Sequence, residues 1–545
     1  MVNDITVVFR VDASLAIGSG HVMRCLALAQ AVHAQGGVCI FLCRQHKSNL
    51  INTISEAGFK IYALSVSRDN CEVDSRCTLA HSHWLGETQE GDACECIPIL
   101  DELQAQWLVV DHYGLDCVWE SLVANHVGSI MVIDDLADRE HCCNLLLDQN
   151  LGRKAADYES LVPPGCTILT GPIYALLRPE FLLLRAESLQ RRKTASLNSI
   201  VVAMGGVDAP DATSKVLAVL NRCTFSSRCI RITVIMGALA PALSRVQDSA
   251  LAMRYPTQVL VNIDNVGSVM AASDLVIGAV GGSAWERCAL GLPTIMVVLA
   301  ENQRLGALAL AAAGAGVLLG EVDEIELKLP VLIGKLDCGG NLHDLSVASS
   351  MLTDGQGVCR VVNHILFSRD NVCRGFGLIR SMCMDDLHDV WQWRNHSDVR
   401  QYMLTQQEIS WAEHLAWFSI ASTDPTRHLL IYEFGGRATG FVSFTQRGTG
   451  GIADWGFYLA PGSGKGMGRK LGKTALDHAF QQLNLHKVSG QSLGFNERSI
   501  RLHQSLGFVQ EGILRDQHFD GTRYHDIFSF GLISHEWRSA REEFI

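Results

Sequence analysis

The sequence lacks the features that mark two broad classes of protein. It has no basic excess, because 57 Asp and Glu outnumber 45 Lys and Arg and give a formal net charge of -12. This balance argues against a general nucleic-acid binder, although it leaves room for local basic pockets that hold a nucleotide diphosphate. Its longest apolar stretch, 307–319, is rich in Ala and Gly and shorter than the roughly 20 residues that cross a bilayer. We therefore expect neither a nucleic acid nor a membrane as a partner.

The 18 cysteines lack the spacing of a metal site or a disulfide framework. The closest are adjacent or one residue apart, as at Cys142-Cys143, and no CxxC is followed by a second CxxC or by HxxxH. Several others lie inside apolar patterns, where cysteine serves as a small core residue. The N-terminal stretch also lacks a basic segment followed by an apolar core. We expect no metal, and a soluble protein in the reducing cytoplasm.

What is present is the pattern of packed α/β domains. Apolar residues make up 48% of the chain and charged residues 19%, and 545 residues exceed what one core holds. Short β-rich runs alternate with longer helical patterns, and runs that are apolar throughout suit strands buried on both faces. The sequence therefore predicts parallel sheets with covering helices. The expected strands are 6–11, 38–43, 107–111, 130–134, 145–148, 199–204, 232–236, 259–263, 275–277, 294–299 and 316–319.

These patterns divide the chain into four segments. Two Rossmann-like α/β domains, 1–185 and 186–345, are expected to face each other across a cleft, with ligands at the carboxyl ends of the strands. Polar residues 187–198 suggest a linker between them. Residues 346–373 lack a clear period and are interpreted as a connector with room for a docking helix. An α+β domain, 374–545, follows, with expected helices at 385–393 and 411–420, strands at 429–433, 440–444 and 453–459, and a turn at Gly435-Gly436.

A glycine turn, Gly18-Ser19-Gly20-His21, joins the first expected strand to the first expected helix. The apolar residues after it recur with helical spacing and mark one buried face, so His21 falls in the first turn of the helix. The helix dipole disfavours a charged imidazole there, which leaves a neutral ring able to accept a proton. We predict that His21 is a catalytic base. The alternative is a capping or core histidine.

A second glycine turn, Gly281-Gly282-Ser283, follows an expected strand and opens a helix. Glycines let a phosphate approach the backbone, and free N–H groups at a helix start attract an anion. This turn is therefore a candidate diphosphate site, with a tight structural turn as the alternative. Glu286 is a candidate acceptor for ribose hydroxyls. Asn302 and Gln303 follow the next strand at the same edge.

Further motifs lie at strand ends throughout the first 340 residues. They are Arg10-Val11-Asp12-Ala13-Ser14, Ile17-Gly18-Ser19-Gly20-His21 with Arg24, Asp111-His112-Tyr113-Gly114, Ile133-Asp134-Asp135-Leu136-Ala137-Asp138-Arg139, Leu147-Asp148-Gln149-Asn150, the turn at Gly281 and Asn302-Gln303. Together they resemble the UDP-sugar hydrolases of the pseudaminic-acid pathway, which act on UDP-2,4-diacetamido-2,4,6-trideoxy-β-L-altropyranose.

That resemblance implies a GT-B-like fold, related to glycosyltransferases, and an inverting hydrolysis that needs no metal. It implies that His21 is the base and that Tyr113 and Asn302 line the sugar site. UDP leaves readily, so the site needs a base for water and donors for the diphosphate rather than a protein acid. Asp12 stays open between orienting water or sugar and serving as a turn carboxylate. The candidate substrate contacts are Arg10, Asp12, Gly20, Arg24, Gly281, Gly282, Ser283, Glu286 and Gln303.

The last segment carries another glycine loop, Gly464-Lys465-Gly466-Met467-Gly468-Arg469, that opens a helix and suits a pyrophosphate. The stretch from Asn496 and Ser499 to Phe508 follows it at a fitting distance. Together the two segments resemble GNAT acetyltransferases, which implies that acetyl-CoA is a co-substrate held by the loop, Asn496 and Ser499. Ser463 stands where the family often has Arg or Gln, which puts a side-chain contact in doubt.

His503 stands where many GNAT members have a tyrosine that protonates the departing thiolate. Histidine titrates near neutral pH and suits the same task, so His503 is a candidate acid, with simple packing as the alternative. Trp393-Arg394-Asn395, Tyr402-Met403 and 413–418 resemble the nucleotide-sugar N-acetyltransferase of the same pathway. That likeness implies nucleotide contacts from Arg394, Met403 and His414. The alternative is ordinary helix surface and core.

The two resemblances imply consecutive steps on one UDP-linked amino-sugar. The first is acetylation of the 4-amino group of UDP-4-amino-4,6-dideoxy-N-acetyl-β-L-altrosamine, and the second is hydrolysis of UDP from the product. Three alternatives remain open, because fold resemblance does not fix the substrate. The first half is also compatible with a UDP-sugar glycosyltransferase, and the second with acetylation of a protein N-terminus or another amino-sugar. The whole chain is also compatible with a sugar-nucleotide sensor that lacks catalysis.

Overall fold

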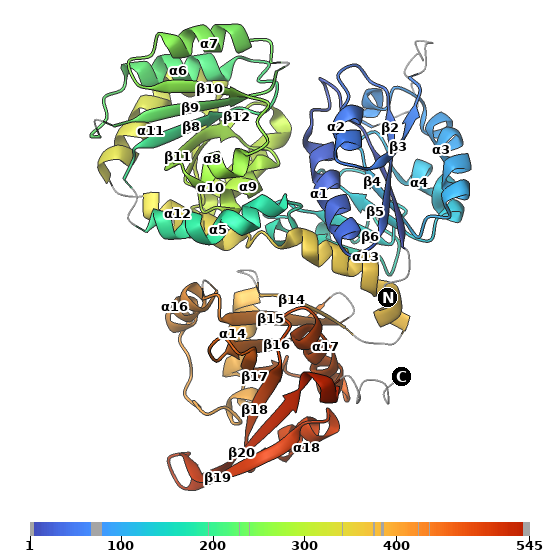
Figure 1. Cartoon of the computed structure of the whole chain (residues 1–545), viewed down its shortest axis with the longest axis vertical. Coiled ribbons are helices and arrows are strands. Elements are labelled where there is room, and N and C mark those ends of the chain that lie inside the picture. The colour runs from blue at the N-terminus through green and yellow to red at the C-terminus, as the bar shows by residue number, and fades with distance from the viewer. Residues whose placement is uncertain are drawn as a thin grey trace. The chain divides into compact units, whose positions relative to one another are not determined.

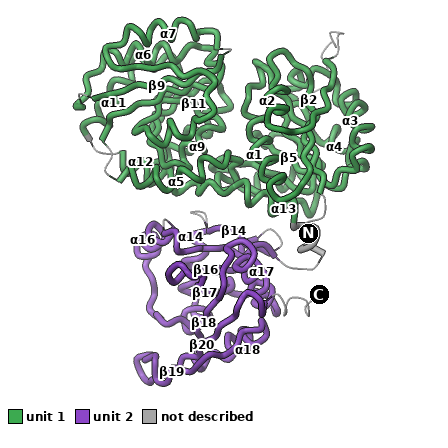
Figure 2. The backbone as a smooth tube through the Cα atoms, viewed as in Figure 1, with its two compact units in different colours: residues 1–366 green, residues 367–545 purple. Residues whose placement is uncertain are grey.

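The computed structural model describes residues 5–66, 79–193, 196–227, 229–238, 240–339, 342–373, 377–382, 386–422, 424–434 and 437–537. The chain forms two compact units, residues 1–366 and 367–545, which Figure 2 draws in different colours. Each unit has its own sheets and its own hydrophobic core. The expected turn at Gly435-Gly436 and the expected domain start at 374 lie outside the described residues.

The first sheet of unit 1 has the strand order β3-β2-β1-β4-β5-β6-β7, and its paired strands are parallel. The five strands expected here are confirmed. The two strands at the sheet edges, β3 and β7, were missed; both are short and only partly buried. The strands are β1 (Thr6–Val11), β2 (Val38–Arg44), β3 (Lys60–Leu64), β4 (Trp107–Asp111), β5 (Ile130–Ile133), β6 (Leu145–Asp148) and β7 (Thr167–Thr170).

The helices around this sheet follow the expected connections. Helix α1 buries Val22, Cys25, Leu26 and Ala29 as its spacing predicted. Gly36, with φ of +91°, turns the chain just after the helix, where a side chain would be strained. The helices are α1 (Gly20–Ala34), α2 (Ile51–Glu56), α3 (Gln89–Leu103) and α4 (Cys117–Val123), with short 3₁₀ turns η1 (Ser82–Trp84), η2 (Ala124–His126), η3 (Ala155–Asp157) and η4 (Pro172–Tyr174).

The second sheet of unit 1 has the strand order β10-β9-β8-β11-β12-β13 and is also parallel, as Figure 1 shows. Its strands were all expected. They are β8 (Ser199–Ala203), β9 (Arg231–Met236), β10 (Thr257–Val261), β11 (Leu275–Ala279), β12 (Thr294–Val298) and β13 (Val317–Glu321). The helices are α5 (Pro179–Arg192), α6 (Ala212–Arg222), α7 (Leu243–Leu251), α8 (Val266–Ala271), α9 (Ser283–Ala289), α10 (Arg304–Ala312), α11 (Ile325–Gly339), α12 (Leu342–Leu352) and α13 (Gly357–Cys373), with η5 (Glu301–Gln303) and η6 (Val322–Glu324).

The polar linker expected at 187–198 is wrong for half of its length. Helix α5 continues to Arg192, and this arginine is 1% exposed. Its Nη2 donates to the backbone oxygens of Met270 at 3.1 Å and Ser273 at 2.8 Å, just at and beyond the end of α8. A guanidinium at a helix C-terminus satisfies carbonyls that lack helical partners. Arg192 therefore fastens α5 to the second sheet region rather than facing water.

The connector expected at 346–373 consists mainly of helix. Helices α12 and α13 fill most of it, and α13 is the docking helix for which the sequence left room. Arg360 of α13 donates to the carbonyl of Ile173 at 2.6 Å and pairs with Asp354 at 2.6 Å. A Cβ at Gly357 would lie 2.3 Å from the backbone oxygen of Ala175, so only glycine fits this close crossing.

Unit 2 contains one mixed sheet with the order β14-β15-β16-β17-β18-β20-β19, in which β17 and β18 are parallel and the other pairs antiparallel. The expected strands and helices are present, although the start of the first helix at 385 lies outside the described residues. The elements are β14 (Leu378–Ser381), β15 (Arg427–Phe434), β16 (Arg437–Gln446), β17 (Ile452–Leu459), β18 (Lys487–Leu493), β19 (Val509–Phe519), β20 (Tyr524–Ile533), α14 (Leu387–Asn395), α15 (Ser397–Arg400), α16 (Trp411–Ala421), α17 (Met467–Gln481) and α18 (Glu497–Ser505).

The two parallel strands of this sheet separate toward their carboxyl ends. They pair only where Ile452 to Asp454 meet Lys487 to Ser489, although β17 runs on to Leu459 and β18 to Leu493. Strands that part inside a sheet leave backbone N–H and C=O groups without ladder partners. The separation therefore offers a polar, extended backbone to a ligand in the middle of unit 2.

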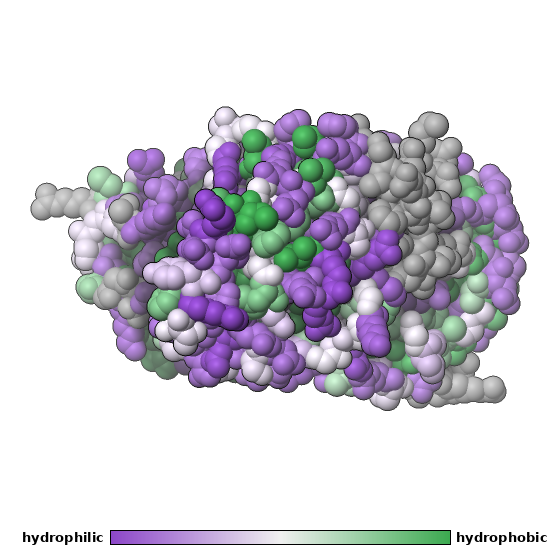
Figure 3. Space-filling model, turned by 90° about the horizontal axis from the view of Figure 1, so that it is seen from below, coloured by the Kyte–Doolittle hydropathy of each residue, from purple (hydrophilic) through white to green (hydrophobic). Residues whose placement is uncertain are grey.

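Figure 3 shows apolar residues among polar ones on the face seen from below. Among the described residues, no helix is both long enough and apolar enough to cross a membrane.

Candidate functional site

His21 lies in the first turn of α1, opposite the carboxyl end of β4. Its Nδ1 is 2.6 Å from Oδ1 of Asp111, the last residue of that strand, and the histidine side chain is 10% exposed. Strands β1 and β4 are direct neighbours, so the chain brings the two residues together from 90 positions apart. A carboxylate only accepts, so a neutral His21 carries its proton on Nδ1. Nε2 is then the nitrogen that can take up a proton.

Arg24, one turn along α1, holds two carboxylates beside this histidine. Its Nε and Nη2 contact Asp111 at 2.6 and 2.7 Å, and its Nη1 lies 2.7 Å from Oδ2 of Asp135. The hydroxyl of Tyr113 donates to the same Asp135 oxygen at 2.5 Å. The Tyr113 ring meets the His21 ring edge-on, with centroids 4.6 Å apart. Each of these side chains contacts the next, and the series returns to His21. The contacts therefore fix the orientation of the His21 ring.

The electrostatics of these contacts keep Asp111 ionised. Burial opposes its charge, but Arg24 and His21 outweigh burial and hold the pKa of Asp111 well below its usual range. Burial works against the Arg24 charge in the same way, and the two carboxylates raise the pKa of Arg24 above its usual value. The chemistry available at this edge is therefore that of a histidine base with a permanently charged partner.

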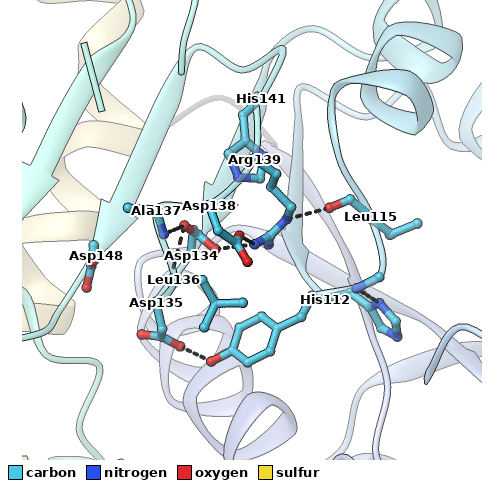
Figure 4. A network of polar contacts seen from close by, with 12 residues as sticks. His112, Leu115, Asp134, Asp135, Leu136, Ala137, Asp138, Arg139, His141 and Asp148 are labelled. Carbon is cyan, nitrogen blue, oxygen red and sulfur yellow. Dashed lines mark hydrogen bonds and ion pairs between the residues drawn. The ribbon is translucent and has the colours of Figure 1, made fainter. Parts of the chain in front are cut away.

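A second group of carboxylates lies at the carboxyl edge of β5 and β6, as Figure 4 shows for Asp134, Asp135 and Asp148. Nδ2 of Asn150 donates to Asp135 at 2.9 Å and to Asp148 at 2.8 Å. The hydroxyl of Tyr158 lies 3.0 Å from Asp134 and 2.8 Å from Asp148. Burial, with the nearby Asp135 charge, raises the pKa of Asp148 to about 7. Asp148 therefore holds a proton over much of the range below neutral pH.

Arg10 and Asp12 lie behind the site and not in it. Arg10 is 0% exposed, and its guanidinium contacts Asp12 at 2.8 Å and Asp92 of α3 at 2.6 Å. Asp12 is 1% exposed and accepts from the backbone N–H of Arg44 at 2.6 Å. Side chains this buried offer little surface to a ligand, and the substrate contacts expected of them stay predictions. They join β1 to β2 and α3, which favours the structural alternative for Asp12.

The glycine turn after β11 has free space around its backbone. A Cβ built on Gly281 or Gly282 would meet no atom within 4 Å, and neither residue has a positive φ. Packing therefore does not demand glycine at either position, which suits a backbone kept clear for a ligand. Ser283 accepts from Nη1 of Arg287 at 3.1 Å. These observations are compatible with the expected diphosphate site.

Other residues expected at the sugar nucleotide already have partners inside unit 1. Glu286 is paired with Arg178 at 3.3 Å, and burial raises the pKa of its carboxyl, so a ribose contact requires that pair to open. The side chain of Gln303 accepts from the backbone N–H of Leu299 at 3.1 Å and so holds the turn after β12. Asn302 is exposed in η5, and Gly20 is exposed at the start of α1.

In unit 2 the glycine loop stands at the start of α17. Gly466 precedes the helix with φ of +85°, a conformation that favours glycine. Met467 is buried and anchors the helix, whereas Gly464, Lys465 and Arg469 are exposed. Gly468 packs closer to α18, since a Cβ there would lie 3.6 Å from Leu502. The exposed part of the loop offers backbone groups of the kind that a pyrophosphate binds.

The residues at the start of α18 have structural roles as well as the expected one. The side chain of Asn496 accepts from the backbone N–H of Ser499 at 3.1 Å and caps the helix. A capping amide still has its own N–H groups to donate. The expected contacts of Asn496 and Ser499 with a cofactor stay predictions.

His503 belongs to the core of unit 2. It is 1% exposed, its Nδ1 lies 2.8 Å from the carbonyl of Ser499, and its Nε2 accepts from Nε1 of Trp455 at 3.1 Å. Its ring also stacks on Phe530, with centroids 4.8 Å apart. Burial lowers the pKa of His503, and both nitrogens are engaged. The structure thus argues against the expected acid and favours the packing alternative.

Two polar atoms on α14 and α16 are buried without partners among the described residues. Nη2 of Arg394 donates to the carbonyl of Thr405 at 2.7 Å, but its Nη1 has no hydrogen-bond partner in the described part of the chain. His414 is 3% exposed and stacks on Trp417, and its Nε2 likewise has no hydrogen-bond partner in the described part of the chain. Buried polar atoms ordinarily find partners, so these two suit a bound ligand. Met403 is half-buried beyond α15.

Sequence reasoning gave no role to Asp111 or Asp135, although a signal was present. Asp111 ends a buried strand next to β1, and Asp135 follows the next strand by two residues. Carboxyl ends of neighbouring parallel strands meet at one edge, which is also where His21 starts its helix. Nothing in the local sequence signalled Trp84, which lies in η1 beside Tyr113. The residues of the described chain contain no group of three or more His, Cys, Asp or Glu arranged to hold a metal ion.

Two family models match parts of the chain. Residues 199–337 match the glycosyltransferase family 28 C-terminal domain, and residues 378–509 match the acetyltransferase (GNAT) domain. The first match covers most of the second sheet region of unit 1, and the second lies within unit 2. The expected fold, Rossmann-like parallel sheets followed by a GNAT domain, is confirmed.

Similar proteins extend these matches. An uncharacterized protein of Methanocaldococcus jannaschii is 23% identical over 509 residues, which cover 91% of this chain and 95% of that protein. The UDP-2,4-diacetamido-2,4,6-trideoxy-beta-L-altropyranose hydrolase of Campylobacter jejuni is 25% identical over 308 residues, 56% of this chain and 97% of that enzyme. The acetyltransferase PseH of Campylobacter jejuni is 25% identical over 120 residues, 22% of this chain and 74% of that enzyme.

Among solved structures, the spermidine N-acetyltransferase from Vibrio cholerae in complex with CoA and spermine shares 24% identity and a TM-score of 0.29. The match covers 30% of this chain and 98% of the chain in that structure. The sequence comparisons confirm both expected resemblances. The chain joins a region similar to the UDP-sugar hydrolase to a GNAT domain similar to PseH.

Proposed function

We propose that this protein is a bifunctional enzyme of pseudaminic acid biosynthesis. It acetylates the 4-amino group of UDP-4-amino-4,6-dideoxy-N-acetyl-β-L-altrosamine and then hydrolyses UDP from the diacetamido product. The observation that carries the proposal is the His21–Asp111 pair, 2.6 Å apart, in a region that resembles a hydrolase of that product over 308 residues. A GNAT domain with similarity to the acetyltransferase PseH in the same chain supports the proposal.

In the hydrolysis, Nε2 of His21 takes a proton from water as the water oxygen bonds to the anomeric carbon. The bond between that carbon and the UDP oxygen breaks, and its electron pair leaves with UDP. The charged Asp111 stabilises the imidazolium that forms and keeps its ring in place. The turn at Gly281 and Gly282 donates backbone N–H groups to the diphosphate. Attack from the face opposite UDP inverts the anomeric centre.

In the acetylation, the loop from Gly464 to Arg469 binds the pyrophosphate of acetyl-CoA. The thioester enters the separation between β17 and β18, where free backbone N–H groups polarise its carbonyl. The neutral 4-amine of the sugar attacks the carbonyl carbon and a C–N bond forms, while the C–S bond breaks and its electron pair leaves with sulfur. The proton that the nitrogen loses ends on the departing thiolate, which leaves as coenzyme A. In this proposal the unpartnered atoms of Arg394 and His414 bind the nucleotide. His503 takes no part in this scheme.

One reaction mixture tests both steps. Acetyl-CoA and the UDP-4-amino sugar are incubated with the protein, and mass spectrometry follows coenzyme A, UDP and the free sugar. We expect all three products from the wild-type chain. His21→Ala should abolish UDP release and leave coenzyme A release intact, and His33→Ala, an exposed histidine on the same helix, should change neither. UDP release that survives His21→Ala would show that His21 is not the base.

The match to the glycosyltransferase family 28 C-terminal domain favours a second candidate for unit 1, a UDP-sugar glycosyltransferase. The same assay separates the two candidates. A hydrolase releases UDP in buffer alone and yields the reducing sugar, whereas a glycosyltransferase needs an acceptor. Tight binding of the sugar nucleotide without any turnover would instead indicate a sensor.

A further inference from the structure

Three aromatic rings surround that of the proposed base His21, and one of them belongs to Trp84. Trp84 stacks on Tyr113, with centroids 5.6 Å apart and 23° between the ring planes. The ring of His81 lies 4.4 Å from that of Trp84 and 5.6 Å from that of Tyr113. The ring of His21 lies 4.6 Å from that of Tyr113 and 6.4 Å from that of Trp84. We call these four residues the aromatic cluster.

The fold holds Trp84 in place. The next residue, Leu85, is 1% exposed and packs in the core of the first sheet. The backbone N–H of Trp84 donates to the carbonyl of His81 at 3.0 Å, and that of Leu85 to Ser82 at 3.1 Å. Trp84 itself is half-buried, so part of its side chain is open. A ring that is fixed before binding loses little freedom when a ligand packs on it.

The ring faces of the aromatic cluster are apolar, whereas the indole N–H of Trp84 and the ring nitrogens of the histidines are polar. Burial, reinforced by nearby His83, lowers the pKa of His81, which keeps that ring uncharged at neutral pH. The hydroxyl of Tyr113 is already bonded to Asp135, and Arg24 holds both Asp111 and Asp135. The face of the Trp84 ring is therefore suited to C–H and methyl groups, and offers no hydrogen-bond partner to a hydroxyl.

We propose that Trp84 is a specificity-determining residue that packs against the methyl groups of the sugar, those of the 6-deoxy carbon and of an acetamido group. The inference rests on the proposed hydrolase function and deepens it. A hydroxyl placed on the same ring would lose its water without gaining a hydrogen-bond partner. Trp84 thus selects a deoxy, N-acetylated sugar, which makes hydrolysis follow acetylation in the order of the two proposed steps.

The test compares two sugar nucleotides. UDP-2,4-diacetamido-2,4,6-trideoxy-β-L-altropyranose carries the methyl groups, and UDP-N-acetylglucosamine has hydroxyls at positions 4 and 6. We expect Trp84→Ala to lower the ratio of their kcat/KM values roughly 10-fold, mainly through a higher KM for the first. Trp84→Phe should restore most of the ratio. His33→Ala, an exposed histidine on α1, should leave it unchanged, and the thermal unfolding of unit 1 in each variant shows that it is folded.

Calorimetry measures the affinities of the two sugar nucleotides, and so tests the role of Trp84 independently of the hydrolysis. The measurements use the His21→Ala chain with and without Trp84→Ala, so that neither nucleotide is consumed. A wild-type chain that binds the diacetamido nucleotide but releases no UDP would overturn the proposed hydrolysis, while a roughly 10-fold loss of affinity on Trp84→Ala would still support the role of Trp84. An affinity ratio of the two nucleotides that Trp84→Ala leaves unchanged would overturn the inference.

Discussion

The sequence suggested catalysis by two histidines, His21 in unit 1 and His503 in unit 2. In the structure the two rings have very different surroundings. His21 is 8% exposed, and one nitrogen is held by a charged carboxylate. His503 is 1% exposed, and a backbone carbonyl and an indole N–H occupy its two nitrogens. Both follow a strand closely and lie on a helix near a glycine-bearing turn, so the sequence pattern alone did not separate them.

The difference teaches what a catalytic histidine requires beyond its position. A base needs one nitrogen oriented by a partner and the other accessible to the proton it accepts. Asp111 provides the orientation for His21. In His503 the second nitrogen accepts a hydrogen bond from Trp455, so its lone pair is not available to accept a proton. The comparison is sharpened by perturbing each partner in turn.

The largest expected effect is that of Asp111→Asn on UDP release. An amide neither carries the charge that stabilises the imidazolium nor fixes the Nδ1–H tautomer of His21. We expect kcat to fall by roughly 100-fold to 10,000-fold. The measurement is the rate of UDP release from the diacetamido nucleotide, with coenzyme A release by unit 2 as the internal reference.

A double-mutant cycle shows whether Asp111 acts through His21. In the His21→Gln background, Asp111→Asn should slow the residual UDP release by less than about 3-fold, because a partner of an absent base has nothing left to orient. Equal losses in the two backgrounds would mean that Asp111 acts mainly through Arg24 and the fold.

The next effect compares the two glycine turns. Gly282→Val and Gly464→Val each place a side chain where the structure has none within 4 Å and where φ is not positive, so neither should strain the fold. If the turns hold diphosphates, Gly282→Val raises the KM for the sugar nucleotide and Gly464→Val the KM for acetyl-CoA, each roughly 10-fold. Steady-state kinetics of both half-reactions on each variant make the measurement.

The cross-assays serve as controls. Gly282→Val should leave acetyl transfer unchanged, and Gly464→Val should leave UDP release unchanged. A variant that weakens both half-reactions would indicate a general loss of fold, and unchanged KM values in all four assays would remove both turns from binding.

Much of the fold was predictable because buried parallel strands are apolar throughout. The two strands missed, β3 and β7, lie at sheet edges where one face meets water. The linker was misjudged because Arg192 looks like a surface residue in the sequence, yet its charge is satisfied by carbonyls of another helix. Long-range satisfaction of a polar group leaves no local pattern.

The candidate site divides in the same way. His21 was predictable from the glycine turn and the spacing of one helix, which are local signals. That Arg10 is fully buried while Arg24 reaches the site depends on Asp92 and Asp135, which come from distant segments. The stacking of Trp84 on Tyr113 depends on the path of a loop between two elements, which propensity and periodicity do not specify.

A smaller effect concerns the pH dependence of unit 1. Asp148 has a pKa raised to about 7 in the fold, above its ordinary value of about 3.9. The native state therefore binds more protons than the unfolded state, and stability from this group is present below about pH 4 and lost as pH rises toward 7. Asp148→Asn removes this loss, so it should stabilise unit 1 relative to wild type by about 3 kcal/mol more at pH 8 than at pH 5. Hydrogen exchange of β6 amides measures it, and a difference that is constant with pH would contradict it.

The smallest expected effect is that of His503→Gln on acetyl transfer, and it bears most directly on the comparison of the two histidines. If His503 were the acid that protonates the thiolate, its removal would lower kcat roughly 100-fold or more. The ionisation of that acid would also disappear from the pH profile. A core histidine should cost less than about 3-fold in kcat, leave the pH profile in place, and lower the free energy of unfolding of unit 2 by about 1–3 kcal/mol, since buried partners lose a well-placed ring. The pH–rate profile of coenzyme A release and the denaturant midpoint of unit 2 decide between them. A large loss of rate without loss of stability would return His503 to the chemistry and erase the contrast with His21.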